Sequence, residues 1–203
     1  MNKTKRQGQA PSPSCLRLLL TSLLFVFTCN LAQAADWDMA KLMAALAQAK
    51  PTTVQFVERK YIAALTQPIV SSGEMRYTPP DRLERRTLKP KPERMLLEHD
   101  TLLLERGGKI YTLSLNDMPE LATLIVSMRA TLAGDRRLLE LNYIVALHGS
   151  REQWTLQLTP SDFDVQQKVK RITLSGSNDQ VQKIEVLQAD GDRSVTTIQK
   201  MPS

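Results

Sequence analysis

Short runs in which apolar and polar residues alternate limit what this chain can fold into more than any other feature. In Val54-Gln55-Phe56 and Met75-Arg76-Tyr77 every second side chain is apolar, so one face of each extended segment can be buried. Such half-buried strands are typical of antiparallel sheets. Two later runs share the pattern, namely Leu102 with Leu104, and Trp154 with Leu156 and Leu158.

Turn signals separate these runs at the spacing of hairpins. Gly107-Gly108 and Asp190-Gly191 each supply two residues suited to a tight turn, and residues 175–179 supply a looser one. About ten short strands with short connections favour one strongly curved antiparallel sheet over alternating β-α-β units. At Pro79-Pro80 two ladder donors are missing in succession, so we expect the sheet to turn there and Leu83 to re-enter its wall.

Two segments have the period of amphipathic helices instead. The first extends from Asp36, a candidate N-cap, to Lys50, just before Pro51. The second extends from Pro119 to Ala133 and is followed by Gly134, a typical helix terminator. The residues expected on the buried face are Trp37, Ala40, Met43, Ala44 and Ala47 in the first helix, and Leu121, Leu124, Ile125, Met128 and Leu132 in the second.

The first 34 residues have the pattern of a secretory signal peptide. Basic residues are followed by an apolar run from Leu18 to Phe27, and Ala32-Gln33-Ala34 offers a cleavage site. The run has about ten residues, too few to cross a hydrocarbon core of roughly 30 Å as a helix. We therefore expect residues 1–34 to be removed and residues 35–203 to form one exported domain.

Removal of this segment would leave the charge nearly balanced. It holds four of the 27 basic residues and none of the 21 acidic ones, so the formal net charge would fall from +6 to +2. A charge this small argues against nucleic acid as a partner. Both cysteines, Cys15 and Cys29, also lie there, so the domain is expected to contain no disulfide and no cysteine metal site.

Patterns that indicate catalysis are missing from the sequence. The two histidines, His99 and His148, are far apart, and neither a nucleophile elbow, a zinc-protease helix nor a phosphate loop is present. Asp190-Gly191-Asp192 is too short for a calcium loop and fits a hairpin turn better. We therefore expect a protein that is not an enzyme and that uses no metal or cofactor.

A sheet of this size has more apolar surface than two helices cover. We expect the helix over 119–133 to lie across the mouth of the curved sheet as a lid that closes an apolar cavity. The side chains predicted to bind a ligand there are Val54, Phe56, Met75, Tyr77, Leu83, Leu102, Leu104, Leu121, Leu124, Ile125, Met128, Trp154, Leu156 and Leu158.

Several short motifs resemble the LolA family of periplasmic outer-membrane lipoprotein carriers. Residues 56–60 look like its F-x-(Q/E)-x-K strand, residues 73–75 like its G-x-(L/M) segment, and residues 79–83 like its R-P-x-x-(F/L) segment, with Pro79 in place of the arginine. Residues 100–102 and 190–194 are similar to two later motifs of the family. The resemblance is greatest to a divergent LolA-related group, some of whose members accompany aryl-polyene lipid biosynthesis.

This resemblance implies an incomplete barrel, plugged by helices, that binds the acyl chains of a lipoprotein or lipid. It also implies a periplasmic monomer that takes cargo from an inner-membrane donor to an outer-membrane acceptor. In such a fold Arg82, Arg85 and Arg86 would lie outside the wall, exposed to solvent or docked on a partner or anionic head groups. Because Pro79 replaces the arginine that holds the family's lid, a lid here would need another fastening.

Two other functions stay open at this point. An anchored acceptor related to the LolB receptor would need an acylated cysteine, but Phe27 and Thr28 stand before Cys29 where small residues are required. A periplasmic enzyme acting on a lipid or glycan would need a nucleophile and a base, which the sequence does not bring together.

Overall fold

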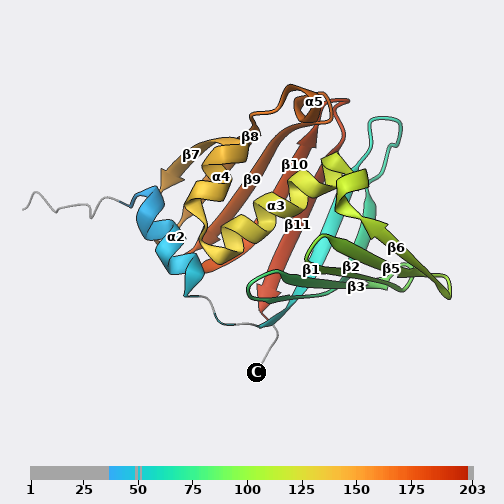
Figure 1. The fold of residues 1–203 in the computed structure, drawn as a ribbon. Coiled ribbons are helices and arrows are strands. Elements are labelled where there is room, and N and C mark those ends of the chain that lie inside the picture. Colours follow the sequence, from blue (N-terminus) through green and yellow to red (C-terminus); the bar gives the residue numbers. More distant parts are fainter. Residues whose placement is uncertain (1–36, 49, 51, 201–203) are drawn as a thin grey trace, which may run out of the picture. The chain divides into compact units, whose positions relative to one another are not determined.

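One open antiparallel sheet makes up most of the structure (Figure 1). The computed structural model describes residues 37–48, 50 and 52–200, and these contain eleven strands in the order β6-β5-β4-β3-β2-β1-β11-β10-β9-β8-β7. The expected fold class, a curved antiparallel sheet that forms an incomplete barrel, is therefore confirmed. The strands are β1 (Thr53–Tyr61), β2 (Ile69–Thr78), β3 (Arg82–Lys89), β4 (Glu93–Glu98), β5 (Thr101–Arg106), β6 (Lys109–Ser114), β7 (Tyr143–Gly149), β8 (Trp154–Pro160), β9 (Val169–Ser177), β10 (Gln180–Gln188) and β11 (Arg193–Lys200).

The predicted turns connect neighbouring strands of this sheet. Gly107 and Gly108 join β5 to β6 with φ angles of 57° and 74°, values that favour glycine and that two-residue hairpins require. Gly191 lies in the connection from β10 to β11, and Pro79-Pro80 lies in the turn between β2 and β3. Leu83 then returns to the wall of the sheet and is buried, as expected.

The second predicted helix has the bounds expected from the sequence. Helix α3 (Pro119–Ala133) ends at Gly134, which has a φ of 68°. The Gly134 N–H donates to the Ala130 and Thr131 carbonyls and so closes the last turn. The other helical segments are α2 (Met39–Ala47), η1 (Leu115–Asp117), α4 (Arg136–Asn142) and α5 (Phe163–Gln166).

Helix α2 differs from the prediction in its start and in its buried face. Asp38 caps it by accepting a hydrogen bond of 2.8 Å from the Lys41 N–H, and the side chains it buries are Leu42, Met43 and Leu46. The predicted face was wrong apart from Met43 and the partly buried Trp37, because leucine and methionine bury more apolar area than Ala40, Ala44 and Ala47 and so turn inward.

The expected signal peptide, with Cys15, Cys29 and the cleavage site, lies outside the described residues, as do Asp36 and Pro51. In the described part of the chain, none of the helices has the length and apolar character needed to cross a membrane.

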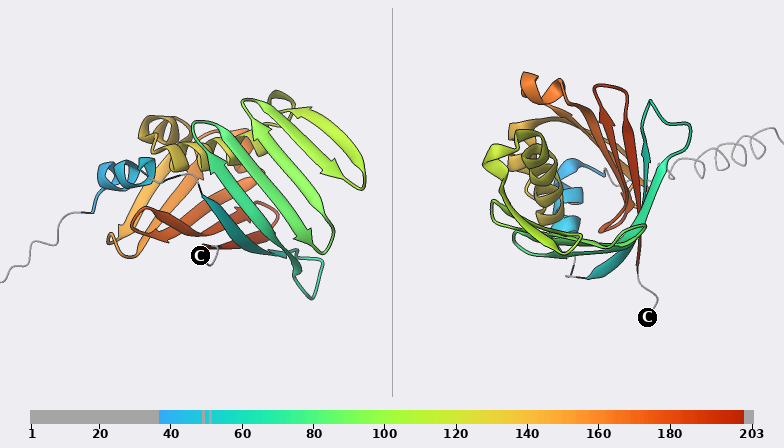
Figure 2. Two further views of the ribbon diagram at one scale, coloured as in Figure 1. Left: turned by 90° about the horizontal axis from the view of Figure 1, so that it is seen from below. Right: turned by 90° about the vertical axis from the view of Figure 1, so that its right-hand side faces the viewer.

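The helices lie on the concave side of the sheet (Figure 2). The core between them and the sheet consists of two clusters of buried side chains. The first cluster joins α2 and α4 to strands β7–β10 and includes Trp154, Leu156 and Leu158. The second joins η1 and the first half of α3 to strands β3–β5 and includes Leu83 and Leu102. Helix α3 contacts both clusters, so it bridges the concave side of the sheet.

Candidate ligand-binding site

The register of the central strands β11, β1 and β2 defines which side chains share their inner face. Val54 lies opposite Met75, and Phe56 lies opposite both Gly73 and Ile198. Side chains at opposite positions of an antiparallel pair point to the same face. Val54, Phe56, Met75 and Ile198 therefore all point toward the concave side, between the two core clusters.

A cavity of about 1000 Å³ lies between these strands and α3. This volume is at the upper end of the range of about 300–1,000 Å³ that is typical of small-molecule sites. Polar residues close to the ends of elements, among them Lys50, Asp179 and Lys200, complete its lining. The apolar lining is formed by Val54, Met75, Tyr77, Leu83, Leu174, Val181, Ile184 and Ile198 from the sheet, and by Met128 and Leu132 from α3.

On the side of the first cluster, the polar groups of helix α3 are buried and hydrogen-bonded, and one of these bonds joins the helix to β7. The Tyr143 hydroxyl donates a hydrogen bond to the Thr123 carbonyl, and burial raises the pKa of Tyr143 to about 12. The fully buried hydroxyls of Ser127 and Thr131 donate at 2.7 Å to carbonyls of the preceding turn. This side of α3 is therefore part of the packed structure.

A different contact fastens α3 to the rim of the sheet. Arg129 donates a hydrogen bond of 2.8 Å from Nη1 to the His99 carbonyl, and its Nη2 lies 3.4 Å from Asp81 Oδ2. Asp81 directly follows the tandem proline, and His99 lies in the turn between β4 and β5. Pro79 stands where the LolA family has the arginine that holds its lid. In this chain Arg129, located on α3 itself, makes the contact that fastens the helix to the rim.

The turn that Arg129 contacts is itself held by a tyrosine from the cavity. The Tyr77 hydroxyl donates a hydrogen bond of 2.8 Å to the Pro80 carbonyl. Burial raises the pKa of Tyr77, although Arg129 acts in the opposite direction. The phenol therefore stays neutral at physiological pH and can keep this donor role.

The structure brings together only some of the predicted ligand-binding residues. Five of them line the cavity: Val54, Met75, Tyr77, Leu83 and Met128. The lining residues Leu174, Ile184 and Ile198 were missed, although they also stand in runs of alternating residues. Whether any of these side chains binds a ligand stays a prediction.

The other predicted residues contact helices or strands instead of the cavity. Leu83, Leu174 and Ile184 belong to the two core clusters and also line the cavity, whereas the side chains named next do not line it. Trp154, Leu156 and Leu158 are fully buried in the first cluster, and Leu124 packs against it. Leu102 and Ile125 are buried in the second cluster, and Leu121 packs against it. Phe56 is buried in β1, and Leu104 lies half-buried opposite Met95.

The three arginines predicted to dock a partner do not share one face. Arg82 and Arg86 lie on the outer face, 3.9 Å from Glu98 and 2.7 Å from Glu84 respectively, and their docking role stays a prediction. The position expected for Arg85 was wrong, because it lies directly opposite Met75 and shares its inward face.

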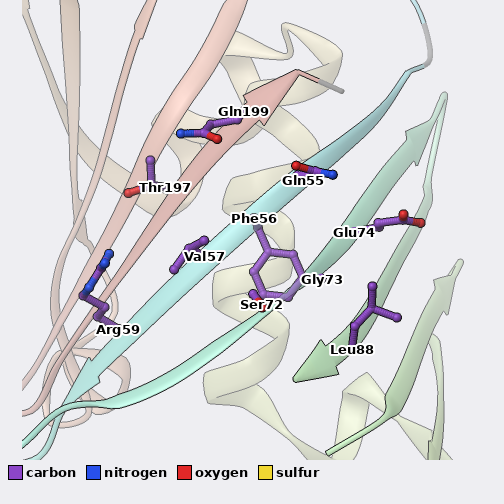
Figure 3. Close-up of a pocket in the computed structure, with 10 residues that line it drawn as sticks. All are labelled: Gln55, Phe56, Val57, Arg59, Ser72, Gly73, Glu74, Leu88, Thr197 and Gln199. Atoms are coloured by element: carbon purple, nitrogen blue, oxygen red, sulfur yellow. The ribbon is translucent and has the colours of Figure 1, made fainter. Parts of the chain in front are cut away.

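A smaller depression of about 410 Å³ lies on the outer face of the central strands. Figure 3 shows it spread over β1, β2 and β11, with Gln55, Arg59, Glu74 and Gln199 beside Val57 and Leu88. Because polar and charged side chains interrupt its lining, it suits an acyl chain less well than the inner cavity does.

No group of three potential metal ligands gathers among the residues that the structure describes. His99 occupies a turn, and His148 lies exposed near the end of β7.

The chain belongs to the family of LolA-like outer membrane lipoprotein carrier proteins, whose model matches residues 31–200. No curated protein matches the sequence.

Solved structures with a similar arrangement include a LolA superfamily protein from Nitrosomonas europaea, with 11% identity, a TM-score of 0.42, and coverage of 81% of this chain and 92% of that one. The lipoprotein LppX of Mycobacterium tuberculosis has 9% identity and a TM-score of 0.42, with 81% and 96% covered. A putative outer membrane lipoprotein-sorting protein domain from Vibrio parahaemolyticus has 7% identity and a TM-score of 0.43, with 79% and 88% covered. Values this low transfer neither a ligand nor a partner to this chain.

Proposed function

We propose that this protein is a periplasmic carrier that binds the acyl chains of a lipoprotein or lipid and moves them toward the outer membrane. The observation that carries the proposal is the cavity of about 1000 Å³ with aliphatic walls beneath α3. Membership of the LolA-like carrier family supports the same cargo class. In this proposal the protein is not an enzyme, and an inner-membrane donor and an outer-membrane acceptor supply the direction of transfer.

The energetics fit a carrier that exchanges its cargo. Each buried CH₂ contributes about 0.8 kcal/mol, so one long acyl chain gains on the order of 10 kcal/mol inside such a cavity. A membrane offers the same chain a similar gain, and so the free-energy difference between the two sites is small. Flexible side chains such as Met75 and Met128 can adapt to chains of different shape.

Site-specific photo-crosslinking tests whether the cavity holds the chain. A photoreactive residue at Met75 should capture a bound fatty acid, while one at Arg76, the next residue on the outer face, should not. Leu156 provides a second control, because it points inward but lies in the packed first cluster. Equal labelling at Met75 and Arg76, or none at either, would exclude the cavity as the acyl site.

The cargo itself is best identified from the protein as the cell makes it. Full-length protein exported to the periplasm should co-purify with acylated molecules that mass spectrometry detects after extraction. A Val54→Trp variant, which fills the cavity, should lose them, while Gln55→Trp on the outer face should retain them. Retention by both variants would argue against this site.

A further inference from the structure

One charged pair lies on the inner face of the sheet, next to the apolar cavity. Glu58 stands two residues after Phe56 in β1, and Arg85 stands two residues after Leu83 in β3, so both follow inward-facing neighbours. Arg85 Nη2 lies 2.6 Å from Glu58 Oε2, and each side chain is only 22% exposed.

A glycine and an aromatic ring determine how the two side chains meet across the intervening strand. Gly73 of β2 lies opposite Phe56 and has no side chain on this face. A Cβ at Gly73 would stand 1.9 Å from the Arg86 carbonyl oxygen, so no other residue fits without moving β3. The Arg85 guanidinium carbon lies over the Phe56 ring, 4.2 Å from its centre, in a cation–π contact.

Hydroxyl groups complete a small polar patch around this pair. Ser71 donates a hydrogen bond of 3.2 Å to Glu58 Oε2 and accepts one of 3.4 Å from Arg85 Nη2. Thr196 of β11 lies opposite Glu58 and is buried. We call Glu58, Ser71, Arg85 and Thr196 the inner polar patch.

Stability alone is a weak reason to keep a charged pair in this place. Removing two charges from water costs about as much as their attraction returns, and apolar side chains of similar volume often stabilise a wall equally well. Arg85 uses only Nη2 for its recorded bonds, and within residues 52–200 no acceptor is recorded for its Nε and Nη1. Those N–H groups lie on different edges of the guanidinium, and each can donate one charge-assisted hydrogen bond to an oxygen of a carboxylate or phosphate.

We propose that Arg85 binds the acidic head group of an acyl-chain ligand whose tail occupies the cavity. Met75, directly opposite Arg85, and Leu83, two residues before it, both line the cavity, so the backbone of Arg85 stands at its border and the side chain extends from there toward Glu58. Glu58 holds the guanidinium in place when no ligand is bound. Lys60 occupies the next inward position of β1. Together, Glu58, Lys60 and Arg85 therefore carry a net positive charge. This inference rests on the proposed function.

The test compares three ligands that share a sixteen-carbon chain: hexadecanoic acid, hexadecyl phosphate and methyl hexadecanoate. The full exported protein should bind at least one of the two acids roughly tenfold or more tightly than the neutral ester, measured by displacement of a fluorescent probe at neutral pH. The two acids distinguish a carboxylate from a phosphate head group. Equal affinity for all three ligands would overturn the proposal.

Variants then assign any preference to Arg85. Arg85→Met should reduce the preference to within about twofold while affinity for the ester stays unchanged. Arg86→Met, on the outer face, is the matched control and should keep the preference. If Arg85→Met unfolds, the double variant Glu58→Gln with Arg85→Met, which leaves no lone buried charge, replaces it. A preference that survives the loss of Arg85 would overturn the inference.

The outcomes also separate this inference from the proposed function. Binding of the ester without preference for the acids would overturn only the role of Arg85. Failure of all three ligands to bind would overturn the proposed function and this inference with it. Glu58→Gln removes an anion that competes with the ligand for Arg85, so it should strengthen binding of the acids several-fold. Weaker binding would contradict the proposal that Arg85 binds the acidic head group.

Discussion

Strands β8 and β1 both alternate in sequence, yet they build different kinds of wall. In β8 every second residue from Trp154 to Pro160 is buried, and the strand packs beneath α2 and α4. In β1 only Phe56 is buried, although Val54 also faces inward. The difference lies in what covers each strand, because helices fill the concave side over β8 and leave a cavity over β1. One region therefore supplies stability, and the other supplies adaptable space.

Introducing a carboxylate into each wall should give the largest contrast. Leu156→Asp places a charge in the fully buried first cluster and should cost about 3–5 kcal/mol or more, a large share of a domain's stability. Met75→Asp places the same group beside the cavity, where water can hydrate it, so we expect a loss nearer about 1–2 kcal/mol. Urea unfolding followed by circular dichroism measures both. Equal losses would mean that the cavity is effectively part of the core.

The next largest effect concerns Arg129, which fastens α3 to the rim on the side of the cavity. Arg129→Met removes hydrogen bonds from a charged donor and should cost about 1–3 kcal/mol. Release of a bound fluorescent fatty acid should also become faster, because α3 then loses its polar contact with the rim and is held there by apolar packing. Stopped-flow fluorescence measures that rate.

Arg136→Met in α4 is the matched control for Arg129→Met. Arg136 is about half exposed, and among residues 52–200 it pairs with Glu140 on its own helix, so its loss should change stability by less than about 0.5 kcal/mol. It should leave ligand release unchanged. If Arg129→Met destabilised the protein without faster release, α3 would be a fixed structural helix and not a lid.

These two regions also show how far the sequence could predict the structure. Alternation and turn residues identify the sheet, and a stripe of apolar residues with Gly134 after it defines α3, because these signals are local. The same alternation cannot distinguish Leu156 from Val54, since both face inward and only the distant helices decide which is packed. The inward turn of Arg85 depends on register with β2 and on Gly73, contacts between strands that no single segment contains.

Tyr143 should give a smaller effect that belongs to the packed region. Tyr143→Phe removes its hydrogen bond to the Thr123 carbonyl and should cost about 1 kcal/mol at neutral pH. The buried phenol has a pKa of about 12, above its ordinary value of 10.0, because burial disfavours the phenolate. Its contribution is therefore complete below pH 10 and is lost as the pH rises through about 12.

Urea unfolding of the wild type and Tyr143→Phe between pH 8 and 11.5 tests this pH dependence. The stability difference between them should shrink as the pH rises above 10, because only the wild type has this phenol to ionise. A difference that stays constant over the range would show that Tyr143 titrates equally in the folded and unfolded chains.

The smallest effect is expected on the outer face of strands β3–β5, where charged side chains form ion pairs with one another and not with a ligand. Glu84 accepts hydrogen bonds of 2.7 Å from both Arg94 and Arg86, and Arg94 also contacts Glu105. The bond from Arg94 is the main cause that lowers the pKa of Glu84 below its ordinary value of 4.5. Its stabilisation is therefore present above pH 4.5 and is lost as the pH falls through the lowered value.

Glu84→Gln should cost less than about 1 kcal/mol at pH 7 and should leave ligand affinity unchanged. Equilibrium unfolding measures the stability, and probe displacement measures the affinity. A large change in affinity would mean that the outer charges act on the cavity, and the inner and outer faces of β3 would then not be independent.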